Sequence, residues 1–413
     1  MSTGPYDIAI IGSGMAGLYL ATELLRKKRK QRIVVIEKFK ELGGRASTFY
    51  QTVNGVKLQW EAGAGRISEG HTIIKELIRR YKLTWIPIGG EPRYIDTYGS
   101  EPEKDMFEAG IQAFLHPLTA LPDEVLGTQT IKQILTKIHG SAKTEEYTIR
   151  FPYRAELETM RADMALKLFM HEFSRSEKYG IVAEGISAIK EGLRAEFEKK
   201  GGIILREHEC KKIEGTTLVK ISCIHEGQPV VIGADRCVVA VPVEALKGIE
   251  PFATWPGHKH LLMKPLLRFY GVFPEQWAES RIITSTPIRY VIPGNPEIGS
   301  IQMSYTDSQD ADAWKLRLDQ VGEKKVGEEI LEQLRRLVKP SIPPPSFVRA
   351  HYWEHGVTYW LPGSYDPFKE SKAAYRPLPD MPRVYLCGES YSVRQGWMEG
   401  AVEHAAGVLR FLD

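Results

Sequence analysis

The alternation of apolar and polar residues near the N-terminus predicts a strand, a glycine turn, a helix and a second strand. The apolar run from Tyr6 to Gly12 (YDIAIIG) is typical of a strand buried in a parallel sheet. Apolar residues then recur at three- and four-residue intervals as far as Leu25, which indicates a helix, and RIVVIEK at 32–38 predicts the second strand. The segment therefore predicts a right-handed βαβ unit of the kind found in dinucleotide-binding sheets.

Two later segments carry similar patterns. From residue 185 a helical pattern ends at paired glycines, strand-like runs follow, and the apolar strand DRCVVAVP occupies 235–242. Within this segment Glu226-Gly227 lies between two apolar runs and predicts a hairpin. Near the C-terminus RVYLCGES at 383–390 is strand-like, and residues 396–412 predict a helix rich in small residues.

Together these segments predict an α/β fold whose first part is a discontinuous Rossmann-like, dinucleotide-binding domain. We expect it to comprise residues 1–78, 181–247 and 378–413. The segments between them, 79–180 and 248–377, are richer in Trp, Tyr and Pro. They suit a mixed α+β substrate domain.

Composition excludes several classes of partner. The 413 residues are 43% hydrophobic and 26% charged, with a formal net charge of +3, so no surface-wide field favours nucleic acid or membrane phosphate. We expect no signal peptide and no membrane span, and hence a soluble, cytoplasmic protein. The cysteines show no metal-binding or disulfide spacing and are expected to be reduced thiols of the core: Cys210, Cys223, Cys237 and Cys387. No metal site is expected.

A glycine motif supplies the first candidate binding site. Gly12, Gly14 and Gly17 form GxGxxG between the first strand and the helix, where glycines allow a tight turn and close approach of the backbone to a diphosphate. Glu37 ends the second strand, where a carboxylate can accept both ribose hydroxyls. The candidate residues of this turn are Gly12, Ser13, Gly14, Met15, Ala16 and Gly17. NAD and FAD both fit this pattern.

The next segment favours FAD. In KELGGRAST, Gly44 and Arg45 follow the second strand closely enough for the guanidinium to reach the same diphosphate. Taken alone, an isolated GGR would favour a surface loop with a solvated arginine.

At this point the sequence resembles the flavin-containing amine oxidases, a family that includes monoamine, polyamine and L-amino-acid oxidases. Four motifs in the family's order carry the resemblance and span nearly the whole chain: GSGMAG with Glu37, LGGRA at 42–46, EAGAGRI at 61–67, and the pair LCGES at 386–390 and GWMEGAVE at 396–403. Together they are specific.

The resemblance implies an FAD-binding first domain. It places Glu37 on the adenosine ribose, Arg45 near the diphosphate, Gly63 to Arg66 along the flavin, and Glu389 on the ribityl or phosphate side. Further expected FAD contacts are Lys38, Ala64, Gly65, Cys210, Gly388, Trp397, Met398 and Ala401. Monoamine oxidases tether FAD through a cysteine in a stretch where this chain has His355 and Gly356, so non-covalent FAD is expected.

Candidate chemistry at the flavin centres on one lysine and an aromatic slot. Lys264 lies in an apolar, strand-like run and matches the family lysine that holds a water against the flavin; from its neighbours alone it reads equally as a strand-edge lysine. Trp360 and Trp397 fall at or near the positions of two rings that face each other before the flavin. Trp360 also suits a core position, and Tyr359 competes for its role.

Arg66 leaves the substrate open between an amine and an amino acid. In amino-acid oxidases the matching arginine clamps the substrate carboxylate, but the tyrosine that completes this clamp has no clear match around Arg289 and Tyr290. The amine is slightly favoured. We expect hydride transfer from the carbon beside nitrogen to FAD, with oxygen as acceptor and an imine and hydrogen peroxide as products. The alternatives are an L-amino-acid oxidase that uses Arg66, a carotenoid-type flavin desaturase or isomerase, and a non-enzymatic structural flavoprotein.

Overall fold

The N-terminal βαβ unit forms as its hydrophobic pattern predicts. In the computed structural model, which describes residues 5–28, 30–53, 55–89, 91–95, 110–172 and 178–412, strand β1 (Tyr6–Ile11) leads into helix α1 (Met15–Lys27) and strand β2 (Ile33–Ile36). The two strands are parallel neighbours. All of β2 is buried, as expected for a strand covered on both faces.

Seven strands of the described residues form the first sheet, in the order β10-β11-β12-β1-β2-β9, with β18 paired to β12. β12 runs parallel to β1 and β18, whereas β10, β11 and β12 form an antiparallel meander. The sheet thus contains strands from all three predicted segments. The added strands are β9 (Ile203–Leu205), β10 (His208–Glu214), β11 (Val219–His225), β12 (Gln228–Val239) and β18 (Val384–Leu386).

The predicted hairpin is the turn between β11 and β12. Glu226 and Gly227 have φ angles of 49° and 76°. A two-residue turn with both φ positive matches the right-handed twist of the flanking strands, which is why glycine is favoured there.

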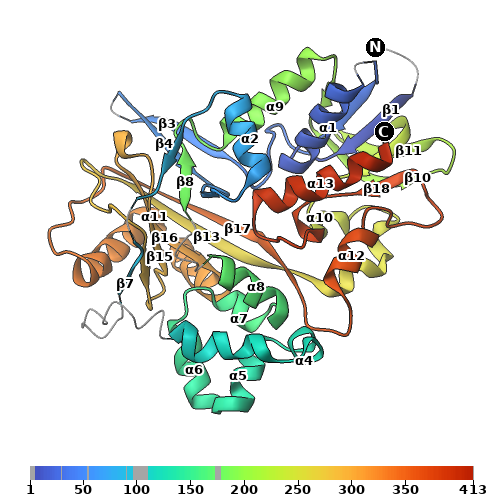
Figure 1. Ribbon diagram of the computed structural model, residues 1–413. Helices are drawn as coiled ribbons and strands as arrows, with labels where there is room; N and C mark the ends of the chain where they lie inside the picture. The colour runs from blue at the N-terminus through green and yellow to red at the C-terminus, as the bar shows by residue number, and fades with distance from the viewer. Residues whose placement is uncertain are drawn as a thin grey trace.

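Successive residues of each strand point to opposite faces of the first sheet, so apolar side chains emerge on both faces. Helices cover these side chains. Ile8 and Ile10 of β1 belong to one apolar cluster with α1, α2 (Thr72–Arg80), α9 (Ser187–Lys199) and α13 (Met398–Leu412). Ala9 and Ile11 belong to a second cluster that reaches into the helical segment. Figure 1 shows α1, α9 and α13 gathered around this sheet near both chain ends.

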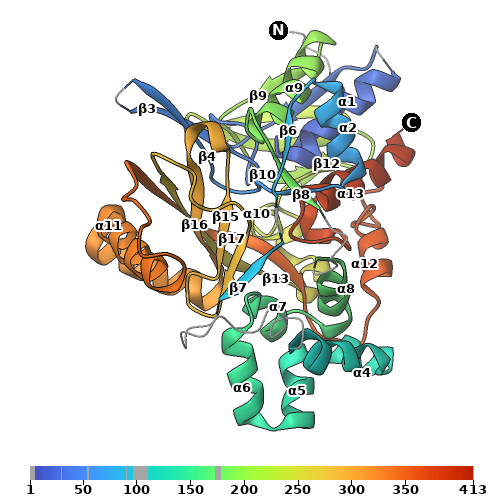
Figure 2. The same ribbon diagram turned by 60° about the vertical axis from the view of Figure 1, so that its left-hand side comes forward.

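A second sheet contains six described strands in the order β17-β13-β16-β15-β14-β7. The long helix α11 (Ser308–Leu337), kinked at Gly322, packs on one face of it through Phe269 and Met303. Figure 2 shows α11 on the outer side, away from the first sheet. The strands are β7 (Arg93–Ile95), β13 (Leu261–Val272), β14 (Ile282–Thr284), β15 (Tyr290–Pro293), β16 (Ser300–Asp307) and β17 (Phe347–Trp360).

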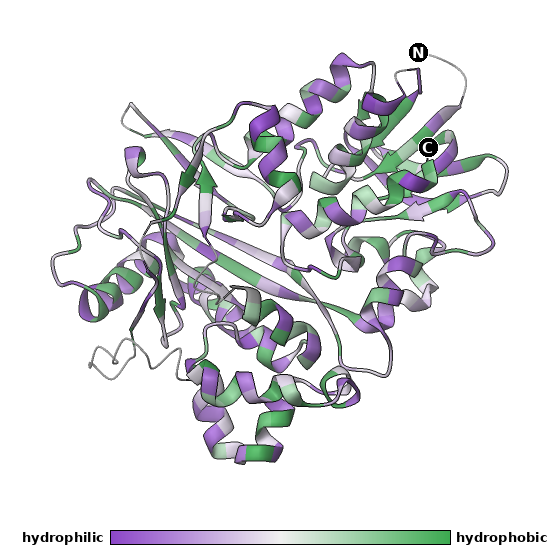
Figure 3. Cartoon of the chain, in the orientation of Figure 1, coloured by the Kyte–Doolittle hydropathy of each residue, from purple (hydrophilic) through white to green (hydrophobic). Residues whose placement is uncertain are grey.

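A helical segment lies beside the second sheet, at the bottom of Figure 1. A capping box between Thr130 and Gln133 starts its helix α5. Its helices are α4 (Asp123–Thr128), α5 (Ile131–His139), α6 (Ser141–Arg150), α7 (Arg154–Glu158) and α8 (Ala162–Glu172), after a π-helical turn Ile111–Leu115 and a 3-10 turn His116–Ala120. In Figure 3 the strands alternate green apolar stretches with pale or purple ones, and the outer helices carry purple polar faces.

Short elements complete the described chain. β3 (Thr48–Val53) and β4 (Val56–Glu61) form a hairpin, and β5 (Ile67–Ser68), β8 (Tyr179–Val182) and β6 (Trp85–Pro87) form a small sheet. The remaining helices and turns are α10 (Val243–Leu246), α12 (Pro367–Ala373), Phe252–Thr254, Pro256–His260, Pro296–Ile298 and Glu389–Tyr391. Among the described residues, no helix is both long and apolar enough to cross a membrane.

Candidate active site

The glycine motif forms a tight turn with room for a ligand. A Cβ at Gly12 would lie 2.7 Å from the carbonyl oxygen of Ala240, and a Cβ at Gly17 would lie 2.0 Å from that of Gly12. Both positions therefore require glycine. Gly14 is different, because among the described residues nothing lies within 4 Å of a Cβ built there. The turn is closely packed on the protein side and open on the other.

The same turn presents the N-terminus of α1. Gly14 caps the helix without a side-chain hydrogen bond, and the first turn contains no acidic residue. The free N–H groups and the helix dipole therefore favour an anion. Four predicted FAD contacts lie in one apolar cluster at the starts of α1 and α13, and each is 5% to 8% exposed: Met15, Ala16, Met398 and Ala401.

Glu37 lies at the carboxyl end of β2, directly against the turn. Its Oε2 accepts hydrogen bonds from the backbone N–H of Ser13 at 2.9 Å and from the Ser13 hydroxyl at 2.6 Å, and its Oε1 accepts from the N–H of Phe39. The carboxylate is thus fixed where the sequence motif places the ribose. The backbone of β10 passes here too, because the N–H of His208 donates to the carbonyl of Glu37.

Two neighbouring candidates point elsewhere. The Lys38 side chain is 54% exposed and pairs with Glu209 at 2.9 Å. Cys210 lies on β10 directly opposite Cys223 and is buried. The hydrogen bond with Cys223, followed by burial, raises the pKa of Cys210, and its side chain is thus a neutral core thiol, so a contact with FAD would involve its backbone.

Arg45 and Glu389, which are far apart in the sequence, form an ion pair of 2.8 Å. Arg45 also donates to the carbonyl of Gly356, and Glu389 accepts from the N–H of Gly396. The loop at Gly63 packs against the same arginine, because a Cβ at Gly63 would lie 1.8 Å from the Arg45 carbonyl oxygen. Three of the sequence motifs therefore meet at one place.

These residues fit FAD. Among the described residues, no atom lies within 4 Å of a Cβ built at Gly388, and a Cβ at Gly44 would reach only the Cα of Gly14, at 4.0 Å. The backbone is thus open along a line from the glycine turn to the Arg45–Glu389 pair. An uncapped helix N-terminus, a guanidinium and a ribose-binding carboxylate along this line are the groups that a dinucleotide requires.

Beyond this line lies a cavity between β4, the loop 63–66, the second sheet, α7 and the start of α13. Six predicted site residues line it: Ala64, Gly65, Arg66, Tyr359, Trp397 and Met398. Residues that the sequence did not single out as site residues line it as well, among them Glu61, Tyr153, Glu156, Arg268, Gln302 and Tyr305.

Arg66 lies among aromatic rings in the cavity wall. Its guanidinium carbon is 5.4 Å from the ring centroid of Trp397 and 4.7 Å from that of Tyr179. Its Nη2 donates to the hydroxyl of Tyr153 at 3.2 Å. His71 contacts the Trp397 ring edge-on at 4.9 Å, which fixes the indole beside Arg66.

Trp360 does not take part in the aromatic slot. The indole is 1% exposed and donates to the carbonyl of Ser392 at 3.0 Å, and its backbone N–H donates to Gln395. Because neighbours on a strand point to opposite faces, Tyr359 turns toward the cavity when Trp360 turns into the core. The Tyr359 hydroxyl donates to Glu156 at 3.2 Å. Tyr359 therefore lines the cavity together with Trp397, whereas Trp360 does not line it.

Lys264 lies on β13 opposite Val357, which lines the cavity. Directly opposed residues of an antiparallel pair share a face, so Lys264 leaves the sheet on the cavity side. Lys264 itself is not a lining residue, and its role beside the flavin stays a prediction. Arg268, four residues further along β13 and beyond a register shift between Lys264 and Leu266, does line the cavity.

Glu61 and two tyrosines of the cavity have displaced pKa values. Burial raises the pKa of Glu61 to about 7, although it accepts hydrogen bonds from the Thr48 hydroxyl and the N–H of Ile186. Burial also raises the pKa of Tyr305 and of Tyr359, and Glu156 adds to both shifts. The tyrosines are therefore neutral hydrogen-bond donors at neutral pH.

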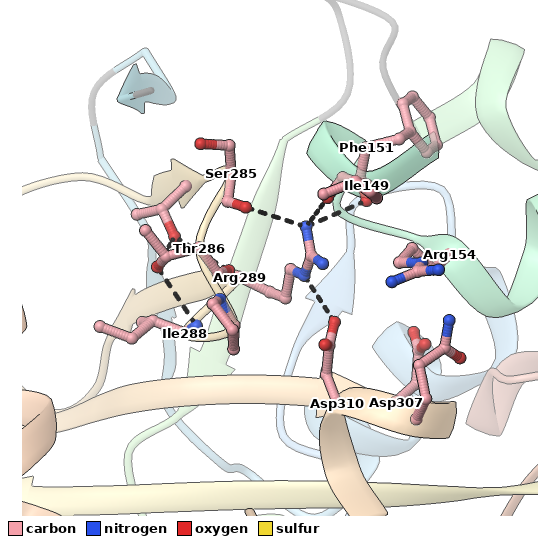
Figure 4. A network of polar contacts seen from close by, with 12 residues as sticks. Ile149, Phe151, Arg154, Ser285, Thr286, Ile288, Arg289, Asp307 and Asp310 are labelled. Atoms are coloured by element: carbon pink, nitrogen blue, oxygen red, sulfur yellow. Dashed lines mark hydrogen bonds and ion pairs between the residues drawn. The ribbon is translucent and has the colours of Figure 1, made fainter. Parts of the chain in front are cut away.

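Arg289 lies where the sequence offered no clear match for the tyrosine of the carboxylate clamp. In the structure this arginine has a structural role. It is 3% exposed, pairs with Asp310 at 2.7 Å and donates to the carbonyl of Ile149 at 2.6 Å (Figure 4). It thereby ties the helical segment to the second sheet. Asp307 lies in the same network, and burial followed by the neighbouring Asp310 raises its pKa to about 7.

Comparison with known proteins gives a consistent result. A putative L-amino-acid oxidase of Bacillus subtilis (strain 168) is 24% identical over 459 residues, which cover 97% of this chain and 93% of that protein. An L-amino-acid oxidase of Echis ocellatus is 36% identical over 84 residues, 20% of this chain and 16% of that protein. A solved structure of putrescine oxidase bound to putrescine matches the fold with a TM-score of 0.76 at 18% identity, covering 98% of this chain and 99% of that one.

The model of the flavin containing amine oxidoreductase family matches residues 15–408, nearly the whole chain. The chain therefore belongs to the flavin-containing amine oxidoreductases and is a flavin-dependent amine oxidase with FAD as its cofactor.

Proposed function

We propose that the chain oxidises the carbon–nitrogen bond of an α-amino acid, with oxygen as the electron acceptor and hydrogen peroxide as a product. The observation that carries this proposal is the guanidinium of Arg66 in the cavity wall, 3.2 Å from the hydroxyl of Tyr153. A guanidinium with a phenol beside it suits a substrate carboxylate, which accepts from both. Tyr153 supplies the hydroxyl for which the sequence offered no match.

The chain's own residues would then orient the substrate. Arg66 and Tyr153 hold the carboxylate, and the faces of Trp397 and Tyr359 border the carbon chain. The buried wall excludes water, so the amine remains neutral without a strong base beside it. FAD, when bound, accepts the hydride from the α-carbon. Glu37, Arg45 and the N-terminus of α1 would hold its adenosine and diphosphate.

A peroxide-coupled assay tests this proposal with matched pairs, such as phenylalanine against 2-phenylethylamine. We expect the amino acid to be the better substrate. In Arg66→Met, KM for the amino acid should rise by about a hundredfold, because a buried charge-assisted hydrogen bond is lost. KM for any amine that is oxidised should change little. If the unmodified enzyme and Arg66→Met both oxidise the amine faster than the amino acid, the carboxylate role of Arg66 is wrong.

Glu156 favours a second candidate, an amine with a further cationic group. Its carboxylate is 6% exposed and lines the cavity, where it accepts from Tyr359. A buried carboxylate attracts an ammonium group more strongly than one in water. Diamines in the same peroxide assay separate the two candidate functions. The second candidate requires faster turnover of diamines than of any α-amino acid.

A further inference from the structure

Arg268 belongs to the cavity and lies next to the loop that carries Arg66. It is on β13, opposite Tyr305 of β16, and its guanidinium carbon lies 5.0 Å from the centroid of the Tyr305 ring. A Cβ built at Gly65 would be 3.4 Å from its Nη1. Arg66 and Arg268 therefore both line the cavity beside the loop that contains Gly65.

The hydrogen-bonding capacity of Arg268 is poorly used. Its Nη1 has the Tyr270 hydroxyl at 3.4 Å and the Gln302 side-chain oxygen at 3.5 Å, both long for bonds from a charged donor. Its Nε is buried without a hydrogen-bond acceptor, and among the described residues its guanidinium forms no ion pair within 4.0 Å, although Glu61 lies near enough to interact with its charge. A half-buried cation whose Nε–H has no acceptor is costly unless an anion joins it.

Burial raises the pKa of Glu61 and the charge of Arg268 lowers it, but among the described residues neither Glu61 nor Glu156 forms a hydrogen bond or ion pair with the guanidinium. Glu61 accepts from the Thr48 hydroxyl at 2.8 Å and from the N–H of Ile186 at 3.1 Å, so both of its oxygens are held by other donors. Glu156 accepts from Tyr359. Gln302 and Tyr270, by contrast, lie beside Arg268 and have polar groups that can turn toward a bound anion.

We propose that Arg268 binds a second carboxylate of the substrate, so that the chain acts on acidic amino acids, those with a carboxylate in the side chain. This inference rests on the proposed function, in which Arg66 takes the α-carboxylate. The planar fork of a guanidinium matches a carboxylate with two parallel hydrogen bonds, and the free Nε–H supplies one of them. Arg268 then selects among amino acids and takes no part in the oxidation itself.

A binding measurement that needs no turnover tests the proposal. The FAD-loaded enzyme is titrated by calorimetry with glutarate, a dicarboxylate, and with butyrate, a monocarboxylate. We expect glutarate to bind at least about tenfold more tightly, the effect of one charge-assisted hydrogen-bonded pair. Arg268→Gln should remove this difference and leave butyrate binding unchanged, and Arg268→Lys should retain part of it. Equal affinities for both anions in the unmodified enzyme would overturn the proposal.

The control is Arg349→Gln, which changes an arginine on the adjacent strand β17 that is 37% exposed and pairs with Glu323. It should keep the preference for glutarate, and retention of FAD checks that every variant is folded. A peroxide assay with glutamate, glutamine and lysine then tests the proposed function and the role of Arg268 separately. Turnover of none of them, with glutarate binding intact, contradicts the proposed function alone. Faster turnover of lysine or glutamine than of glutamate contradicts the role of Arg268.

Discussion

The orientation of single residues on their strands decides which of the predicted side chains line the cavity. Tyr359 and Trp360 are adjacent, and both were candidates for the aromatic slot because the family pattern places an aromatic residue at or near this point. The strand allows one of them to face the cavity, and only the register of β17 against β13 settles which. Tyr153 and Arg268 carried no motif, so their place in the cavity follows from the fold alone.

Glu61 predicts a measurable pH dependence of stability. Its pKa is raised to about 7 in the folded state, so between its ordinary value and this value the folded chain retains a proton that the unfolded chain loses. This contribution to stability is present at low pH and is lost as the pH rises toward 7. In Glu61→Gln it is absent at every pH, because the amide does not titrate.

We therefore expect Glu61→Gln to gain stability relative to the unmodified protein between pH 5 and pH 8, by roughly 2 kcal/mol. Urea unfolding at several pH values measures the difference in free energy of unfolding. Asp307 titrates in the same range, and because both proteins contain it, its effect cancels in the difference. A constant difference across this range would show that Glu61 titrates normally.

At the scale of elements, the hydrophobic pattern was a reliable guide where each element carries its own signal. The first βαβ unit, the hairpin at Glu226-Gly227 and the C-terminal helix formed as predicted, since strand periodicity, paired turn residues and small apolar residues are local properties. The helices between 123 and 172 were not predicted individually. Their apolar residues pack against a sheet that is distant in the sequence, and the spacing of these residues does not indicate that burial.

One contact between elements predicts a large loss of stability. Helix α2 starts at Thr72, and its preceding residue His71 provides no side-chain cap. Glu399 of α13 takes that role: its carboxylate is completely buried and accepts from the hydroxyl of Thr72 and the N–H groups of Ile73 and Ile74. A charge at a helix N-terminus with several donors is strongly stabilised.

We expect Glu399→Ala to lower the free energy of unfolding by about 3 kcal/mol, because buried N–H groups lose their acceptor. Glu399→Gln should cost less, since its amide oxygen can still accept. Denaturant unfolding measures both changes, with Glu403→Ala as a control one turn further along the same helix, where the carboxylate is 37% exposed. Equal losses for Glu399→Ala and Glu403→Ala would show that the cap contributes nothing.

At the scale of the whole molecule, the fold brings together motifs that the chain separates by hundreds of residues. The family motifs predict a cofactor domain, because the resemblance assigns their glycines and charges to parts of one ligand. They could not predict the substrate wall. That wall is assembled from β4, the second sheet, α7 and the start of α13, and none of these carries a motif for its own side chains.

The ion pair of Arg45 with Glu389 is the point where this assembly can be tested. Arg45 joins the loop at 42–46 to the carbonyl of Gly356 and to Glu389, and Glu389 in turn holds the N–H of Gly396 ahead of Trp397. Arg45→Met removes these links together with the cation beside the open backbone of Gly14 and Gly44. We expect FAD to bind at least about tenfold more weakly, because the diphosphate loses a charge-assisted partner.

The affinity is measured by titrating FAD into stripped protein and following the quenching of flavin fluorescence. Arg383→Met, which changes an exposed arginine bonded to the carbonyl of Asp235, is the matched control and should bind FAD as the unmodified chain does. Acid precipitation of the unmodified enzyme should release the flavin into solution, as expected of a cofactor held by hydrogen bonds and charge alone. Flavin that remains with the precipitate would indicate a covalent bond. Unchanged affinity in Arg45→Met would mean that the diphosphate lies away from the Arg45–Glu389 pair.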